Sequence, residues 1–200
     1  MQHSVIFHPL RRLYDWVLLW AHHRHARLAL FALAFAESSV FPIPPDVLLI
    51  ALALGLPTRA FQFALLTTVG SVLGGLAGYS IGYGLMASVG QWIIDLYNFQ
   101  EQFQRIRELY LDYDVWAVGI AGFTPIPYKV FTIAAGAFEM DPWRFTFASL
   151  FSRGARFYLV AWLLHHYGSP MKDFIDHYFN ALTVLFTVML VGFFILLTYL

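Results

Sequence analysis

The sequence contains no cysteine and few charged residues, and both absences narrow what the protein can be. Without cysteine there is no disulfide, no thiolate nucleophile and no sulfur-ligated metal. Charged residues make up 12% of the 200 residues, whereas an average soluble domain carries roughly 25%. Twelve basic residues balance twelve acidic ones, so we expect no nucleic-acid partner.

Hydrophobic residues are abundant instead, at 60% of the chain. They gather in stretches long enough for membrane spans, which need about 20 residues each. We therefore expect an all-α integral membrane protein.

A ten-residue phrase occurs twice, 83 residues apart, with its charge reversed. Residues 42–51 (PIPPDVLLIA) reappear as residues 125–134 (PIPYKVFTIA), with six of ten positions identical. Asp46 in the first copy corresponds to Lys129 in the second. The prolines that break the two apolar stretches are Pro42, Pro44, Pro45, Pro125 and Pro127. Such breaks free backbone groups that lipid cannot satisfy, and paired broken segments are typical of repeat-built transporters with a site near the midplane.

These breaks predict two re-entrant helical hairpins in an inverted repeat, packed with transmembrane helices inside one membrane domain over residues 28–166. The predicted elements are an amphipathic interfacial segment over residues 1–27, a hairpin over 28–56, a transmembrane helix over 60–88, an amphipathic helix over 91–114, a second hairpin over 115–138, a transmembrane helix over 143–166 and a C-terminal transmembrane helix over 173–200.

Four glycines recur at four-residue intervals in the first long helix: Gly70, Gly74, Gly78 and Gly82. This spacing places them on one face, the pattern that lets another helix approach closely. The partner helix could come from the same protomer or from a second one, so a homo-oligomer stays open.

The chain resembles the DedA family, also called VTT-domain or SNARE-associated-type membrane proteins, and most closely its YqaA-like branch. The resemblance covers roughly residues 30–165 and rests on Glu37 followed by Phe41-Pro42-Ile43-Pro44-Pro45-Asp46, on Gly78-Tyr79-Ser80-Ile81-Gly82, and on Phe123-Thr124-Pro125 leading to Ala135-Gly136 and Met140. It implies opposed re-entrant hairpins, a bacterial inner membrane, and movement of undecaprenyl phosphate or phospholipids, proton-linked in bacterial members and by scrambling in eukaryotic relatives.

The resemblance also implies functional residues. The family's two acids correspond to Glu37 and Asp46. Its two arginines of the second hairpin correspond to Gly122 and Tyr128, so neither is present here, and Tyr83 replaces a third arginine.

An ionisable residue inside an apolar segment costs about 2.5–3.5 kcal/mol on insertion scales, so it calls for a partner or a function. We expect Asp46 and Lys129, on equivalent points of the two hairpins, to meet. Arg153 and Arg156 are three residues apart and share one side of their helix.

The resulting hypothesis is a lipid transporter, a flippase or scramblase. Lys129, Arg153 and Arg156, with Tyr128, would bind an anionic lipid headgroup. Glu37 and Asp46 would exchange protons.

Three alternatives stay open at the level of single residues. Asp46 and Lys129 could form a structural ion pair in an assembly protein. Glu37 could cap backbone amides freed by the first break. Arg153 and Arg156 could bond freed carbonyls.

An intramembrane enzyme acting on lipid phosphates is the remaining function class. The sequence has no HExxH or GxSxG motif and no defensible Ser/His arrangement. We therefore expect a protein that is not an enzyme and has no catalytic residue, metal or cofactor.

Overall fold

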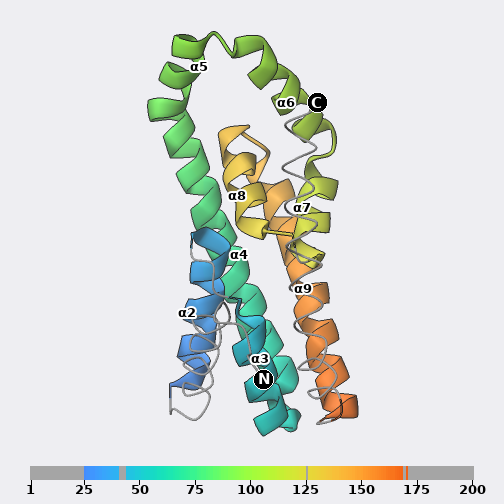
Figure 1. Cartoon of the computed structure of the whole chain (residues 1–200). Coiled ribbons are helices and arrows are strands. Elements are labelled where there is room, and N and C mark those ends of the chain that lie inside the picture. Colours follow the sequence, from blue (N-terminus) through green and yellow to red (C-terminus); the bar gives the residue numbers. More distant parts are fainter. Residues whose placement is uncertain (1–24, 41–43, 125, 169, 171–200) are drawn as a thin grey trace, which may run out of the picture.

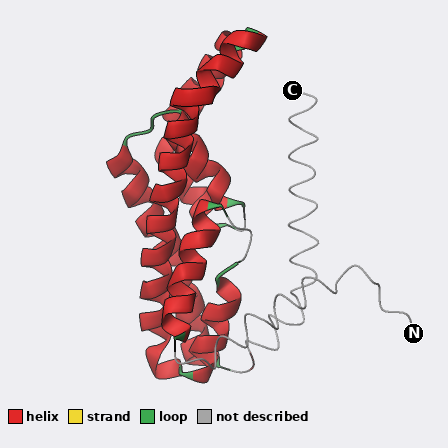
Figure 2. Cartoon of the chain, turned by 90° about the vertical axis from the view of Figure 1, so that its left-hand side faces the viewer, coloured by secondary structure: helices red, strands yellow, loops and turns green. Residues whose placement is uncertain are grey.

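A computed structural model describes residues 25–40, 44–124, 126–168 and 170. The predicted C-terminal span over 173–200, nearly all of the predicted interfacial segment, and Pro42 and Pro125 lie outside these residues. The described part is helical and contains no strand (Figure 2). One of its helices, Pro57–Tyr97, is long and apolar enough to cross a membrane. This agrees with the expected all-α membrane protein.

The first broken segment is a pair of helices, α2 (Ala26–Ser39) and α3 (Asp46–Gly55). Pro44 and Pro45 precede α3, where a proline, which has no N–H to donate, does no harm to the helix. The chain reverses direction between the two helices, so that α2 and α3 share one half of the bundle (Figure 1).

The second broken segment is α7 (Asp114–Phe123) followed by α8 (Tyr128–Ala137), with Pro127 in extended conformation just before α8. This pair occupies the opposite half of the bundle, and the helix ends that flank the two breaks lie near the middle of its length (Figure 1). The helix–break–helix pattern predicted over 28–56 and 115–138 is present in both places.

The predicted amphipathic helix over 91–114 is wrong as a single element. The long helix α4 (Ala60–Leu85) continues through a π-helical turn, η3 (Met86–Gly90), into α5 (Gln91–Tyr97). Asn98 then adopts a left-handed conformation, φ 53°, which ends the helix. A separate amphipathic helix, α6 (Gln100–Asp112), follows.

The helix predicted over 143–166 is α9 (Pro142–Tyr167). Pro142 stands at its first turn, and the carboxylate of Asp141 accepts a 2.8 Å hydrogen bond from the backbone N–H of Arg144. This cap fixes where α9 begins. A short 3-10 turn, η2 (Pro57–Arg59), joins α3 to α4.

Removing this cap has a modest expected effect. The Asp141→Ala variant should lose about 1 kcal/mol of folding stability, because the Arg144 N–H loses its acceptor. Thermal unfolding in detergent micelles measures the loss. The control is Asp112→Ala, which removes an exposed aspartate at a helix end whose side chain makes no hydrogen bond to any residue that the structure describes. Equal losses in both variants would contradict a capping role.

The glycine face of α4 packs inside the protomer. A methyl group added at Gly70 or Gly74 would meet the backbone carbonyl of Phe31 or Phe35 on α2. Further along, the same face meets α8: a Cβ at Gly78 would collide with Thr132, and one at Gly82 with the carbonyl of Ile133. One row of glycines therefore brings one helix from each broken segment against α4.

Two apolar clusters form the core. One joins α2, α3, α4 and the end of α9, around Leu30, Leu49, Phe63 and Phe157. The other joins α7, α8 and the start of α9, around Val118, Phe145 and Tyr128. The polar groups described next lie where these two clusters meet.

Candidate functional site

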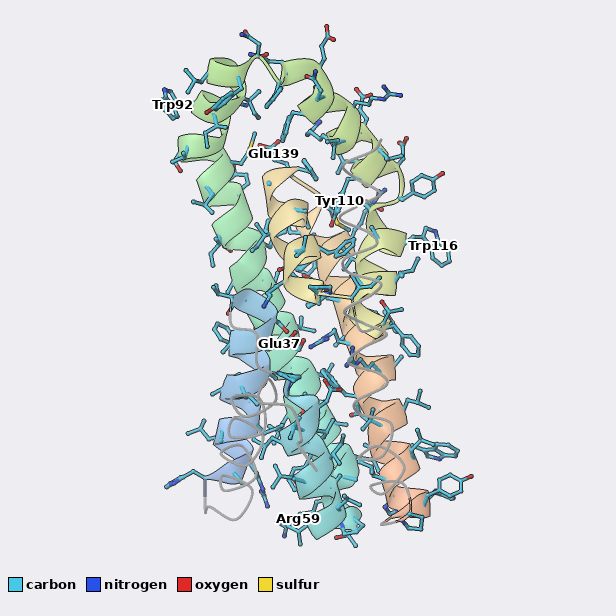
Figure 3. All side chains as sticks on the ribbon, viewed as in Figure 1. Glu37, Arg59, Trp92, Tyr110, Trp116 and Glu139 are labelled. Carbon is cyan, nitrogen blue, oxygen red and sulfur yellow. The ribbon has the colours of Figure 1, made fainter. Side chains whose placement is uncertain are left out.

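A buried ion pair lies at the centre of the bundle. The Arg153 guanidinium Nη2 is 2.8 Å from the Glu37 carboxylate Oε2, with 3% of the arginine side chain and 18% of the glutamate side chain exposed. Arg153 comes from the middle of α9 and Glu37 from the last turn of α2. Figure 3 shows Glu37 midway along the bundle, between Arg59 at its lower end and Glu139 in its upper half. We call Glu37 and Arg153 the inner pair.

Arg153 is held on several sides. Its Nε donates to the Ser71 hydroxyl on α4 at 2.6 Å. Its guanidinium carbon lies 4.9 Å from the centre of the Tyr128 ring and 4.7 Å from that of Phe157, within cation–π range. Groups from α2, α4 and α8 thus fix one side chain of α9.

The inner pair continues into a set of buried hydroxyls, of which the sequence had indicated Tyr128 but none of the serines. The Ser38 hydroxyl donates to Glu37 Oε2 at 3.1 Å and lies 2.7 Å from the Ser71 hydroxyl. The Tyr128 hydroxyl donates to Ser149 at 2.5 Å. A usable signal existed for two of them, since Ser38 directly follows Glu37 and Ser149 stands one helical turn before Arg153.

A second ion pair, the outer pair, joins Arg156 and Asp46. Arg156 Nη2 lies 3.1 Å from Asp46 Oδ2, with 24% of the arginine and 20% of the aspartate side chain exposed. The other arm of the guanidinium, Nη1, donates to the backbone carbonyl of Thr124 at 2.9 Å. Arg156 therefore joins the first turn of α3 to the residue that ends α7, and it bonds a freed carbonyl, as one of the alternative interpretations held.

The expected contact between Asp46 and Lys129 is wrong. Asp46 pairs with Arg156, because α9 passes between the two breaks and presents its arginines there. Lys129 stands half-buried in the first turn of α8. Its side chain has no ion-pair or hydrogen-bond partner among the residues that the structure describes.

Gly122 and Tyr128, where the family resemblance implies arginines, both adjoin Arg153. A Cβ at Gly122 would lie 3.6 Å from Arg153 Cδ and would collide with the Ser152 hydroxyl. Tyr128 is fully buried with its ring against the Arg153 guanidinium. A single arginine from α9 thus occupies the space next to both positions.

An apolar groove of about 590 Å³ opens on the outside of the bundle between α7 and α9. It extends from Trp143 and Arg144 at the start of α9 to Phe123 and Ser152, beside the second break. Trp116, labelled in Figure 3, is on its outer wall. The other lining residues are Val115, Gly119, Phe147, Ala148 and Phe151.

Within the described ranges, no three His, Asp or Glu side chains gather in a way that could hold a metal ion. The polar centre is instead built from acids, guanidinium groups and hydroxyls. Such an arrangement can exchange protons and bind an anion.

Comparison with known proteins gives a family and two relatives. The VTT domain matches residues 43–166. An uncharacterized protein of Haemophilus influenzae is 39% identical over 149 residues, which is 74% of this chain and 77% of that protein. An uncharacterized protein of Histophilus somni is 35% identical over 173 residues, 82% of this chain and 87% of that protein. No solved structure matches the chain at a significant level.

Proposed function

The chain belongs to the VTT-domain family of membrane proteins, also called the DedA family, and on this premise we propose that it moves an anionic lipid across the bilayer. The observation that carries the proposal is the pair of acid–arginine contacts enclosed where two broken helical segments meet. Charged groups inside a membrane are costly and are typically found along substrate or proton pathways.

Helix lengths support re-entrant hairpins. The helices α3, α7 and α8 have 10 residues each, which corresponds to about 15 Å at 1.5 Å per residue. The hydrocarbon core of a bilayer is about 30 Å thick, so each of these helices reaches only to the midplane. In the proposed arrangement, the two hairpins enter from opposite sides as an inverted repeat and their breaks meet at the substrate site.

The headgroup would bind first to the groups that are easiest to free. Lys129 is a cation without a partner among the described residues, and the outer pair is more exposed than the inner pair. Protonation of Asp46 would release Arg156, so that Lys129 and Arg156 together bind a phosphate. Arg153, backed by Tyr128, and Glu37 would form the deeper part of the same site.

The lipid tail needs an apolar path beside this site. The groove between α7 and α9 provides one, because its lining is aromatic and aliphatic and one end lies next to the second break. A substrate such as undecaprenyl phosphate or a phospholipid would fit this division into a charged centre and an apolar wall. The proposed setting is a bacterial inner membrane, with protons as the coupling ion and no chemical conversion of the lipid.

Lipid translocation in proteoliposomes tests the proposal. Labelled undecaprenyl phosphate and a labelled phospholipid are compared, with and without a pH gradient. Asp46→Asn and Lys129→Ala should each lower the rate by about tenfold or more, because each removes a charge from the site. The control Asp95→Asn changes an exposed acid on α5, whose hydrogen bond from Gln100 an asparagine can still accept.

The outcomes separate transport from architecture. Movement that depends on Asp46 and Lys129 supports a transporter, and acceleration by the gradient supports proton coupling over scrambling. Absence of movement of either lipid by folded wild-type protein would overturn the proposal. The second candidate is then an assembly protein. The hydrogen bonds of Arg156 to Asp46 on α3 and to the Thr124 carbonyl favour this alternative, because they hold the two broken segments together.

A further inference from the structure

Three hydrogen bonds join four side chains from α9, α4 and α2 into a continuous path from Arg153 to Glu37. Arg153 Nε donates to Ser71, the Ser71 and Ser38 hydroxyls are 2.7 Å apart, and Ser38 donates to Glu37. Both serines are fully buried. Buried hydroxyl groups normally have hydrogen-bond partners, and among the described residues no buried side-chain oxygen or nitrogen lacks one.

The direction of these bonds follows from the donors. An arginine nitrogen only donates, so the Ser71 oxygen must accept from it. Ser38 gives its one proton to the Glu37 carboxylate, so in its 2.7 Å contact with Ser71 it accepts and Ser71 donates. Both hydroxyls therefore point toward the acid, and this arrangement suits its ionised form.

A proton on Oε2 of Glu37, the oxygen that accepts from both Ser38 and Arg153, requires the opposite arrangement. The protonated Oε2 becomes a donor, and Ser38 must accept that bond and turn its own proton toward Ser71. The Ser71 proton then needs another acceptor, such as the carbonyl one turn earlier, which Thr67 and Thr68 use in the same helix. This rotation disturbs the acceptor of Arg153 Nε.

We propose that Ser38 and Ser71 are positioning residues, which favour ionised Glu37 and transmit its protonation to Arg153. This inference rests on the proposed function for its purpose, since the result is to loosen Arg153 from both Glu37 and Ser71 when a proton arrives. Its chemistry, however, depends only on the buried hydroxyls. It assigns a role to two residues outside the set of charged groups.

Other charged and titratable groups adjoin the same centre. Arg153 from α9 is the direct partner of Glu37, and Tyr128 from α8 adjoins Arg153. Asp46 from α3 is engaged by Arg156. Lys129 stands next to Tyr128 in the first turn of α8. A measurement must therefore observe Glu37 itself.

Infrared titration of the purified full-length protein in nanodiscs gives such a measurement. The carbonyl band of protonated Glu37 is identified as the one missing in Glu37→Gln. Ser38→Ala should raise the pH midpoint of this band by about one unit, because the carboxylate loses a hydrogen-bond donor. Ser71→Ala should shift it in the same direction, and Ser71→Thr, which keeps a hydroxyl, should restore it.

The matched control is Ser152→Ala. Ser152 is buried beside Arg153, but its hydroxyl donates to the Ala148 carbonyl of its own helix. A shift of the pH midpoint in Ser38→Ala and Ser71→Ala without a shift in Ser152→Ala supports the inference. An unchanged midpoint in Ser38→Ala, or equal shifts in all three, would overturn it. Should Ser71→Ala fail to fold, Ser38→Ala and Ser71→Thr decide.

Lipid translocation is measured separately on the same variants. If the serine variants titrate as expected but the wild-type protein moves no lipid, the proposed function is refuted and the role of Ser38 and Ser71 stays supported. If the wild-type protein moves lipid but Ser38→Ala leaves the pH midpoint unchanged, only the proposed role of Ser38 and Ser71 is refuted.

Discussion

Replacing Arg153 by alanine is expected to abolish lipid movement and to lower folding stability by about 3–5 kcal/mol. The change leaves Glu37 enclosed without its counter-charge. It also removes the arginine N–H that donates a hydrogen bond to Ser71. It also empties the space between the Tyr128 and Phe157 rings. Thermal unfolding in detergent and translocation in proteoliposomes measure the two losses.

Two further variants separate charge from geometry. Arg153→Lys keeps the charge but should not restore activity, because a single ammonium lacks the planar fork that bonds Ser71 and Glu37 together. The double variant Arg153→Leu with Glu37→Gln should regain part of the stability and none of the transport, since no unpaired charge stays buried. Arg105→Ala, an exposed site on α6, is the control. Wild-type melting and transport in Arg153→Ala would contradict the site.

Replacing Gly136 by leucine is expected to prevent correct folding, with a loss of about 3 kcal/mol or more. A Cβ at Gly136 would enter the backbone carbonyl of Tyr79, and on the facing helix a Cβ at Gly82 would enter that of Ile133. The two backbones of α4 and α8 are therefore in direct contact on both sides. If α8 moves away to make room, it displaces its own first turn, which carries Tyr128 and Lys129.

The amount of membrane-inserted, monodisperse protein and its melting temperature measure this effect. Gly84→Leu is the matched control, because it lies on α4 and a Cβ there meets nothing within 4 Å. Its stability should change by no more than about 0.5 kcal/mol. Equal behaviour of the two leucine variants would show that α4 and α8 are not in backbone contact.

The prolines and the isolated charges were sufficient to predict the main features of the centre. The broken segments end where the Pro-x-Pro repeats stand, because proline dictates a local conformation that tertiary packing does not override. Glu37, Asp46, Arg153 and Arg156 were selected because charges in apolar helices are costly, and they lie in the same region of the bundle.

The partners of these charges could not be predicted. Sequence equivalence suggested Asp46 with Lys129, but pairing depends on how α9 is rotated between the two segments, and that rotation results from packing across many residues. The buried serines were missed because hydroxyls are frequent in membrane helices. They carry no charge, so burying them in an apolar helix does not have the large energetic cost by which the acids and arginines were selected. The bounds of the 91–114 helix failed at Asn98, whose left-handed conformation no periodic pattern indicates.

The double engagement of Arg156 has a consequence for how the two halves of the molecule can open. One guanidinium bonds both Asp46, in the first turn of α3, and the Thr124 carbonyl, at the end of α7. In the proposed transporter, an anion that captures this side chain would withdraw it from both halves in the same event. The first turn of α3 and the end of α7 would then be released together rather than one after the other.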